Sequence, residues 1–360
     1  MKKPTAIDLF SGCGGLSQGL KDAGFKVLCG CEIRPEARDA YSLNHSEALL
    51  FPDIRVIDEK QLLSDLALKK GQLDLLAACP PCQGFSSIRT KNKSISPDPR
   101  NELIFEVVRL VKALQPKTIL IENVPRLLQD QRIEDFKAQL VNYEFTPGVL
   151  NAENFDVPQR RKRMILIGSR VGKIDLPLHS DSRLNIKDVI AGLPKPESNH
   201  TTPLHRIRQK FTPIVQKRIE AVKKNRSELP VELQLDCHKR YNSGFRDVYG
   251  RMSWDDVAPT ITRSSHNPSK GRFIHPSENR GLTIYEIMLL QGFPNHYKLP
   301  KGLGIGKLSS LLGEAFPPPM AKAQAAQIYN HLKKLETAKA RKPNAGLADK
   351  SLHGSDSFKR

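Results

Sequence analysis

The sequence lacks the features of a membrane or secreted protein. No stretch approaches the about 18 consecutive apolar residues that a membrane-spanning helix needs. The N-terminus, MKKPTAIDLF, has two lysines but no long apolar segment of the kind found in signal peptides. The six cysteines do not form a disulfide framework, since five of them fall within the first 82 residues, mostly in apolar runs. We therefore expect no signal peptide, no membrane association, and a reducing, cytoplasmic compartment.

Acidic residues are few relative to basic ones. The 360 residues include 57 Lys and Arg against 38 Asp and Glu, a formal net charge of +19 with a pI near 9.7. A surface this basic attracts polyanions at long range, and nucleic acid is the commonest such partner. On charge alone, an acidic membrane surface and a basic protein without a polyanionic partner remain open. The length fits two domains, or one large domain with an insertion.

The first 170 residues alternate between two periods of apolar residues. Short runs rich in β-forming residues are separated by amphipathic stretches with helical spacing, such as residues 101–114. This alternation predicts an α/β domain with a mainly parallel sheet, whose ligands lie at the carboxyl ends of the strands. The predicted strands are residues 5–10, 25–33, 73–80, 117–124 and 163–169. Residues near their ends include Asp8, Glu32, Cys82 and Glu122.

The pattern changes after about residue 180. Residues 181–250 are polar, basic and rich in proline, with weak periodicity, and we predict a separate module of short strands or loops there. A helix is predicted at 282–291, where Thr283 and Glu286 have the spacing of a capping box. A last helix is predicted at 317–335, beginning at prolines, and the tail from about 337 is predicted to be disordered.

A glycine-rich turn follows the first predicted strand, in the stretch DLFSGCGGLSQGL at 8–20. Gly12, Gly14 and Gly15 allow a sharp turn and a close approach to a ligand. The turn departs from the dinucleotide pattern G-x-G-x-x-G and has no phosphate-binding lysine. Glu32 lies where a carboxylate can bind a ribose diol. A nucleoside without a pyrophosphate, such as S-adenosylmethionine, fits both features; a plain tight turn and a solvated strand end are the alternatives.

Cys82, in the stretch ACPPCQGFS at 78–86, has several interpretations. A redox pair with Cys79 lacks the Trp-Cys context of such pairs. A zinc site would need a second pair, and its only candidates, Cys29 and Cys31, share one face of a predicted buried strand. We expect Cys79 to be a buried residue of the hydrophobic core. Cys82 follows the strand in a Gly- and Ser-rich loop, where an exposed thiolate can act as a nucleophile.

Two further motifs accompany this cysteine. Glu122, in ENV at 122–124, comes close to Cys82 if the strands at 73–80 and 117–124 are neighbours, which would pair a nucleophile with a carboxylic acid. A helix cap or a salt bridge is the alternative for Glu122. Arg161 and Arg163, in PQRRKR at 158–163, alternate onto one side of an extended chain and would direct two guanidinium groups at one ligand. A solvated basic patch is the alternative for these arginines.

Several motifs together resemble one family. In chain order they are DLFSGCGG, PPCQGFS, ENV, QRRKR, RGLTIYEIMLLQGFP (280–294) and GEAFPPPMA (313–321). They resemble the DNA cytosine-5 methyltransferases of bacterial restriction-modification systems, over about residues 5–170 and 245–333. The resemblance implies a DNA (cytosine-5-)-methyltransferase in which a cytosine is flipped out of the duplex and forms a covalent adduct with Cys82.

The resemblance also implies a division into domains. An S-adenosylmethionine-binding, Rossmann-like catalytic domain with a mainly parallel sheet would comprise residues 1–180 and 305–335. A smaller, loop-rich target-recognition domain would comprise residues 181–304, with its variable part at about 175–250. Residues 336–360 would form a disordered basic tail.

Each catalytic motif acquires a role from the resemblance. Cys82 resembles the nucleophile that adds to C6 of cytosine, and Glu122 the acid that contacts N3 and the exocyclic amine. Arg161 and Arg163 resemble the residues that orient the base and hold the active-site loop. A Ser-, Gly- and Lys-rich loop at 84–101 could fill the gap left by the flipped base, with Ile88 as a wedge. The expected DNA contacts are Ser86, Ser87, Ile88, Arg89, Lys91, Gln159 and Arg272, with Asn267, Ser269 and Lys270 as further backbone contacts.

The implied cofactor is S-adenosylmethionine, and no metal is expected. Phe10 resembles the ring stacked on adenine, Asp53 the carboxylate near the adenine amine and Glu32 the ribose ligand, while Pro81 would shape the pocket. The expected cofactor contacts are Phe10, Ser11, Gly12, Cys13, Gly14, Gly15, Glu32, Ile33, Asp53, Ile54, Pro81, Leu103, Glu314 and Ala315. Glu314 departs from the family, which usually has an Asn there. Its carboxylate would face that of the cofactor unless it turns away or pairs with the amino group.

The implied partner is double-stranded DNA, with a cognate restriction endonuclease as a functional partner. The protein is expected to be a monomer in the bacterial cytoplasm, at the nucleoid when it is on DNA. One alternative is a tRNA cytosine-5 methyltransferase of the same architecture, and another is a non-catalytic DNA-binding regulator. The large basic module favours duplex DNA, and the intact set of Cys82, Glu122, Arg161 and Arg163 favours an enzyme.

Overall fold

A seven-stranded sheet forms the larger lobe of the computed structural model, which describes residues 3–81, 102–180, 183–223, 229–236 and 247–340. The strand order is β3-β2-β1-β4-β5-β7-β6. Strands β3, β2, β1, β4 and β5 are parallel, whereas β7 runs antiparallel to both of its neighbours. The bounds are β1 Thr5–Leu9, β2 Lys26–Cys31, β3 Leu49–Phe51, β4 Leu75–Ala78, β5 Thr118–Asn123, β6 Glu144–Asn151 and β7 Lys162–Ser169. The predicted mainly parallel sheet is confirmed.

All five predicted strands are present, but the two edge strands were not predicted. β6 contains Pro147 and Gly148, which weaken a strand pattern in the sequence. Proline is tolerated in β6 because the strand lies at the edge of the sheet, where one side of its backbone needs no partner strand. β3, at the other edge, has only three residues, too few for a periodicity to be visible.

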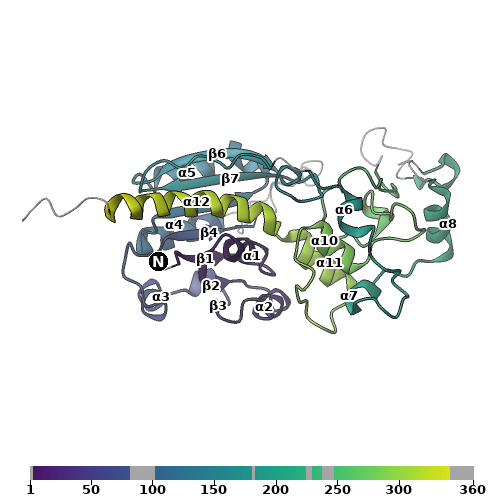
Figure 1. Ribbon diagram of the computed structural model, residues 1–360, viewed down its shortest axis with the longest axis horizontal. Helices are drawn as coiled ribbons and strands as arrows, with labels where there is room; N and C mark the ends of the chain where they lie inside the picture. Colours follow the sequence, from purple (N-terminus) through teal and green to yellow (C-terminus); the bar gives the residue numbers. More distant parts are fainter. Residues whose placement is uncertain (1–2, 82–101, 181–182, 224–228, 237–246, 341–360) are drawn as a thin grey trace, which may run out of the picture.

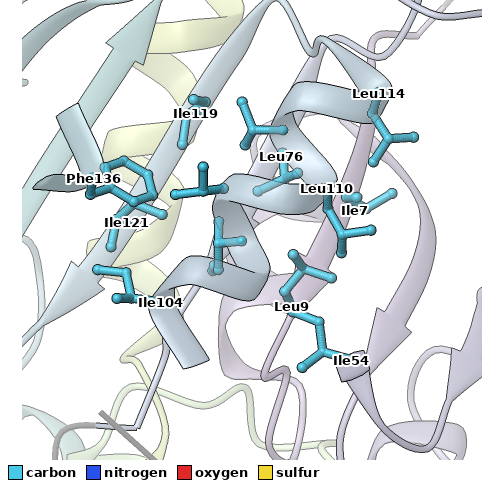
Figure 2. Packing of buried hydrophobic residues seen from close by; sticks show 14 of the residues in the cluster. Ile7, Leu9, Ile54, Leu76, Ile104, Leu110, Leu114, Ile119, Ile121 and Phe136 are labelled. Carbon is cyan, nitrogen blue, oxygen red and sulfur yellow. The ribbon is translucent and has the colours of Figure 1, made fainter. Parts of the chain in front are cut away.

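Helices cover both faces of this sheet (Figure 1). On one face, α1 (Gly15–Asp22) and α12 (Pro318–Ala340) pack together with the strands. They approach so closely that a Cβ on Gly19 would lie 2.6 Å from the Pro318 carbonyl oxygen. The other face is covered by α3 (Glu59–Asp65), α4 (Leu103–Leu114) and α5 (Gln131–Ala138), and Figure 2 shows Leu110 and Leu114 of α4 against this layer. Burial of each large apolar side chain here contributes about 1.5–3 kcal/mol.

The second lobe is built around its own apolar cluster and lies at the other end of the molecule (Figure 1). Its helices are α6 (Ile186–Ile190), α7 (Pro203–Arg206), α8 (Pro213–Ala221), α10 (Ile284–Leu290) and α11 (Ile305–Glu314). The prediction of short strands or loops within 181–250 is therefore wrong for three segments, which are helical. Both α7 and α8 begin at a Thr-Pro pair, with proline in the first turn, a start signal that the weak periodicity obscured.

Buried charges organise this lobe. The predicted capping box at Thr283 and Glu286 is present, with both reciprocal hydrogen bonds. Arg280 donates to both oxygens of Glu286, at 2.7 and 2.8 Å. Arg251 is 4% exposed and donates to the carbonyl oxygens of four residues, which lie at the end of α8 and in a later loop (Ile219, Val222, His275 and Glu278). Arg251 thus donates hydrogen bonds to backbone carbonyl groups that, among the described residues, have no partner in a helix or sheet.

The remaining elements are short. They comprise α2 (Pro35–Ser42) and the 3-10 turns Ile54–Val56, Pro125–Gln129, Ala152–Asn154, Val231–Leu233 and Pro268–Lys270. Among the described residues, no helix is long and apolar enough to cross a bilayer. α12 extends to Ala340, so the first residues of the segment predicted as a disordered tail, 336–340, are helical, and residues 341–360 lie outside the described residues.

Candidate active site

The carboxyl ends of four neighbouring parallel strands meet at one edge of the sheet. β1 leads there to the glycine-rich turn, β2 to Glu32, β4 to Pro80 and Pro81, and β5 ends at Glu122 and Asn123. β4 and β5 are hydrogen-bonded neighbours, as the expected proximity of their loops requires. The Asn123 side chain donates to the Pro80 carbonyl oxygen at 3.0 Å, so the segment before Cys82 is tied to the end of β5.

Glu122 has a specific partner. Its Oε1 lies 2.8 Å from Nε of Arg163, which projects from the antiparallel strand β7, and both side chains are largely buried. Burial, and next the charge of Glu122, raises the pKa of the Cys79 thiol well above its usual value, so Cys79 is a protonated thiol and not a nucleophile. The expected core position of Cys79 is consistent with its packing against the strands.

Arg161 and Arg163 make different contacts within the described part of the chain, and whether both reach one ligand stays a prediction. Arg161 is 3% exposed and donates to the carbonyl oxygens of Ile261, Gly313 and Ala315, at 2.8, 3.1 and 3.2 Å. A planar guanidinium with five N–H donors suits several carbonyl groups at once. Arg161 therefore holds chain segments of the second lobe beside the sheet, while Arg163 holds the carboxylate.

Gln159, predicted to contact DNA, is fully buried. Its Nε2 donates to the side chain of Gln291 at 2.6 Å, and its Oε1 accepts from the Ile261 N–H at 2.9 Å. The prediction is wrong for this structure, because a side chain with no exposed surface and internal partners has no atom directed at solvent. Arg272 is half-buried and pairs with Asp247 at 3.0 Å, and Asn267 caps the turn Pro268–Lys270 through the Ser269 N–H.

The residues predicted in the loop after Pro81 lie outside the described residues. They are Cys82 and the expected DNA contacts Ser86, Ser87, Ile88, Arg89 and Lys91. Their assignments stay predictions.

The glycine-rich turn has the conformation of a ligand-binding loop. Phe10 and Gly12 have positive φ values of 60° and 55°, and such a value is uncommon for a residue other than glycine. The Gly12 N–H donates to Oε2 of Glu32 at 3.0 Å, which joins the turn to the end of β2. A Cβ built on Gly12 would meet no atom within 4 Å, so the space before the turn is open. An open turn beside a largely buried carboxylate fits a nucleoside such as S-adenosylmethionine.

The other expected cofactor contacts differ in their surroundings. Ser11 packs beside β2, where its N–H donates to the Cys31 carbonyl oxygen at 2.9 Å. Ile33 is 58% exposed, whereas Ile54 is buried in the core. Asp53 pairs with Arg55, whose hydrogen bond holds the pKa of the Asp53 carboxyl below its usual value. Leu103 begins α4 and is partly buried against the same core.

The back of the turn is fastened to the second lobe. The Cys13 thiol lies 3.3 Å from the Leu311 carbonyl oxygen, and burial raises its pKa to about 12, so its side chain points away from the open space. Tyr297 donates to the Cys13 carbonyl oxygen at 2.5 Å, and Nε2 of His45 lies 3.1 Å from the Gly14 carbonyl oxygen. Tyr297 and His45 could not be predicted from the sequence, because both contact main-chain atoms that are far from them along the chain.

Glu314 pairs with two arginines. Its Oε2 lies 2.5 Å from Nη1 of Arg34, and its Oε1 pairs with Arg263. The negative charge at this departure from the family is thus balanced by protein groups. The chain beyond it packs on the glycine-rich turn, since a Cβ on Gly15 would lie 3.3 Å from the Ala315 side chain. Arg34 is a site residue that motif matching missed.

Comparison with known proteins identifies the family of the chain. The profile of C-5 cytosine-specific DNA methylases matches residues 5–330. The chain belongs to this family. A Type II methylase of Herpetosiphon aurantiacus, M.HgiDII, is 31% identical over 91% of this chain and 96% of its own length. The Type II methyltransferase M1.HphI of Haemophilus parahaemolyticus is 32% identical over 90% of this chain and 86% of its own.

Solved structures of similar fold support the architecture. A protein described as a DNA modification methyltransferase encoded within an E. coli prophage superposes with a TM-score of 0.72 at 22% identity, covering 92% of this chain and 99% of its own. S. pombe Dnmt2 superposes with a TM-score of 0.58 at 20% identity, over 93% and 99% of the two chains. The chain is therefore a DNA cytosine-5 methyltransferase that uses S-adenosylmethionine, and the tRNA and non-catalytic alternatives are disfavoured. Among the described residues, no cluster of His, Cys, Asp and Glu could hold a metal.

Proposed function

We propose that this methyltransferase is the modification enzyme of a Type II restriction-modification system and methylates one cytosine in a short duplex sequence through a covalent adduct at Cys82. The observation that carries the catalytic part is the buried ion pair of Glu122 and Arg163 at the end of β5. It lies next to the chain segment that leads into Cys82, because Asn123 holds the carbonyl of Pro80.

The mechanism follows from the weakness of cytosine as an electrophile. A thiolate adds to C6 only if the ring can accept the electron pair. Glu122 must therefore carry a proton when it contacts N3 and the exocyclic amine, and it gives this proton to N3 while Cys82 forms the S–C6 bond. Arg163 fixes the orientation of the Glu122 carboxyl group. S-adenosylmethionine, when bound, supplies a methyl group on a positively charged sulfur to the activated C5. Loss of the C5 proton and of the Cys82 thiolate then restores the aromatic ring.

The cofactor site draws on the open turn and its neighbours. Phe10 would stack on adenine, Glu32 would accept from the ribose hydroxyl groups and Asp53 would lie near the adenine amine. The partly exposed Ile33 side chain adds an apolar surface beside Glu32.

Target recognition and cellular context complete the proposal. Residues of about 175–250 would select the sequence, and the net charge of +19 supplies attraction to the DNA backbone. The Type II names of the relatives support a cognate restriction endonuclease as a functional partner. We place the protein in the bacterial cytoplasm as a monomer.

A trapped adduct tests the nucleophile. Duplex DNA containing 5-fluorocytosine is incubated with S-adenosylmethionine, so that the methyl group is transferred to C5; the final elimination is then blocked, because fluorine cannot leave C5 as a proton does. The wild type and Cys79→Ser should each form a stable adduct on the peptide containing residue 82, whereas Cys82→Ser should form none. Mass spectrometry of the digested complex locates the bond. An adduct at another cysteine would refute the assignment.

A sequencing experiment tests the substrate. Plasmid DNA from cells that express the chain should resist bisulfite conversion at one cytosine of a recurring short sequence. Cells that express Cys82→Ser are the control and should give full conversion. Methylation found only in tRNA from the same cells would refute the proposed substrate.

A further inference from the structure

One guanidinium group is shared between two carboxylates beside the glycine-rich turn. Nη1 of Arg34 lies 2.5 Å from Oε2 of Glu314, whereas Nε of Arg34 lies 3.3 Å from Oε1 of Glu32. The Arg34 backbone N–H also donates to Glu32, at 2.9 Å. The guanidinium of Arg34 therefore makes a short hydrogen bond to Glu314 and a long one to Glu32.

The hydrogen-bonding capacity of Glu32 is nearly used. An ionised carboxylate has about four lone-pair sites. In this structure three donors occupy them: the N–H groups of Gly12 and Arg34, and the Nε of Arg34. A ribose diol brings two further hydroxyl donors, so one present contact must yield. The contact at 3.3 Å is the longest of the three and the weakest.

We propose that Glu314 is a positioning residue for the cofactor, which keeps Arg34 from closing into a bidentate pair with Glu32 and so leaves the Glu32 oxygens available to the ribose. The inference rests on the proposed assignment of Glu32 as the ribose ligand. Without a charge at position 314, the Arg34 fork would turn to Glu32, because bidentate guanidinium–carboxylate pairing is the strong arrangement. Arg263 balances the second oxygen of Glu314.

Calorimetry of cofactor binding without DNA tests this role. The ligands are S-adenosylhomocysteine and 5′-methylthioadenosine, which has the same adenine and ribose but no amino-acid moiety. Glu314→Gln should raise the Kd of both ligands by the same factor, about tenfold for the loss of about 1.4 kcal/mol. Arg34→Ala should bind at least as tightly as the wild type. The double variant Arg34→Ala with Glu314→Gln should return to within about threefold of the wild type.

Matched variants separate the outcomes. Glu134→Gln removes a carboxylate that pairs with Lys137 at 2.7 Å on α5, and it should leave both Kd values unchanged. Weakened binding of S-adenosylhomocysteine alone would mean that Glu314 contacts the amino-acid moiety, and additive effects in the double variant would mean that Arg34 is not the competitor; either result overturns the inference. An unchanged Kd for Glu32→Gln would refute the ribose assignment itself. A weakened Glu32→Gln with an unchanged Glu314→Gln would refute only the role of Glu314.

Discussion

At the scale of single residues, the site depends on how each charged group is partnered. Arg163 and Arg161 lie two residues apart, yet the first holds the Glu122 carboxylate and the second holds three carbonyl groups. The alternation of an extended chain predicted that both would face one side, but it could not predict that segments from the second lobe would take up one of them. Partners that come from 100 residues away leave no local signal.

Asp8 is the buried carboxyl group with the clearest pH dependence. It is fully buried on β1, where burial raises its pKa to about 7 despite a 2.7 Å hydrogen bond from Ser17. The folded state therefore binds more protons than the unfolded chain between about pH 4 and 7, and this group's contribution to stability falls as the pH rises through that window. The loss is at most about 4 kcal/mol, from a shift of about three pKa units.

Asp8→Asn should remove this dependence, because an amide carries no charge at any pH. Urea unfolding at pH 5 and pH 8 measures this dependence. The free energy of unfolding of the variant minus that of the wild type should be about 1–3 kcal/mol more positive at pH 8 than at pH 5. Asp22→Asn, an exposed carboxyl group on α1, is the control and should show no such change. An equal difference between Asp8→Asn and wild type at both pH values would contradict the prediction.

At the scale of elements, the core helix α4 illustrates a pattern that sequence analysis could find. Its apolar residues recur at helical spacing, and the structure buries Leu110 completely between the helix and the sheet (Figure 2). Leu110→Ala should lower the free energy of unfolding by about 2–5 kcal/mol, because it removes buried apolar contacts and leaves a cavity. Val141→Ala, at a position that is 82% exposed, should change it by less than about 0.5 kcal/mol. Urea unfolding at constant pH compares them, and equal losses would contradict the burial.

The elements that the sequence predicted share a strong periodic signal. Buried parallel strands such as β4 and β5 are nearly continuous apolar runs, and Thr283 with Glu286 forms a local cap, so both are visible in the sequence. The helices between 186 and 221 were missed because they are short and bury few residues each. The position of α8 depends instead on Arg251, which donates to the carbonyl oxygens of Ile219 and Val222 and whose partners no sequence pattern reveals.

The residues of the candidate site also fall into those that could be predicted from the sequence and those that could not. The turn at Gly12, the carboxylate of Glu32 and the position of Glu122 could be predicted, because a parallel sheet brings strand ends to one edge. The contacts of Gln159 and Arg34 could not, because each depends on a partner in the second lobe: Gln291 just after α10 and Glu314 in α11.

At the scale of the whole molecule, a buried hydrogen-bond network joins the two lobes. Gln159, in the segment that leads into β7, donates to Gln291 after α10, and Gln291 donates to the Ala315 carbonyl oxygen at 2.7 Å. Arg161 donates to the same carbonyl oxygen at 3.2 Å. Because both glutamines are fully buried, the relative position of sheet and second lobe is set by groups that have no water to replace a lost partner.

A double-mutant cycle on the two glutamines measures this coupling. Gln159→Leu and Gln291→Leu should each lower the free energy of unfolding by about 1–3 kcal/mol, since each leaves a buried polar partner unsatisfied. The double variant removes both side chains of the pair, so its loss should fall short of the sum by about 1 kcal/mol or more. Gln139→Leu, at an exposed position, should have little effect. Urea unfolding at a fixed pH gives all four values. Additive losses would mean that the lobes are held independently at these two points, and the network would then not be what fixes the sheet against the second lobe.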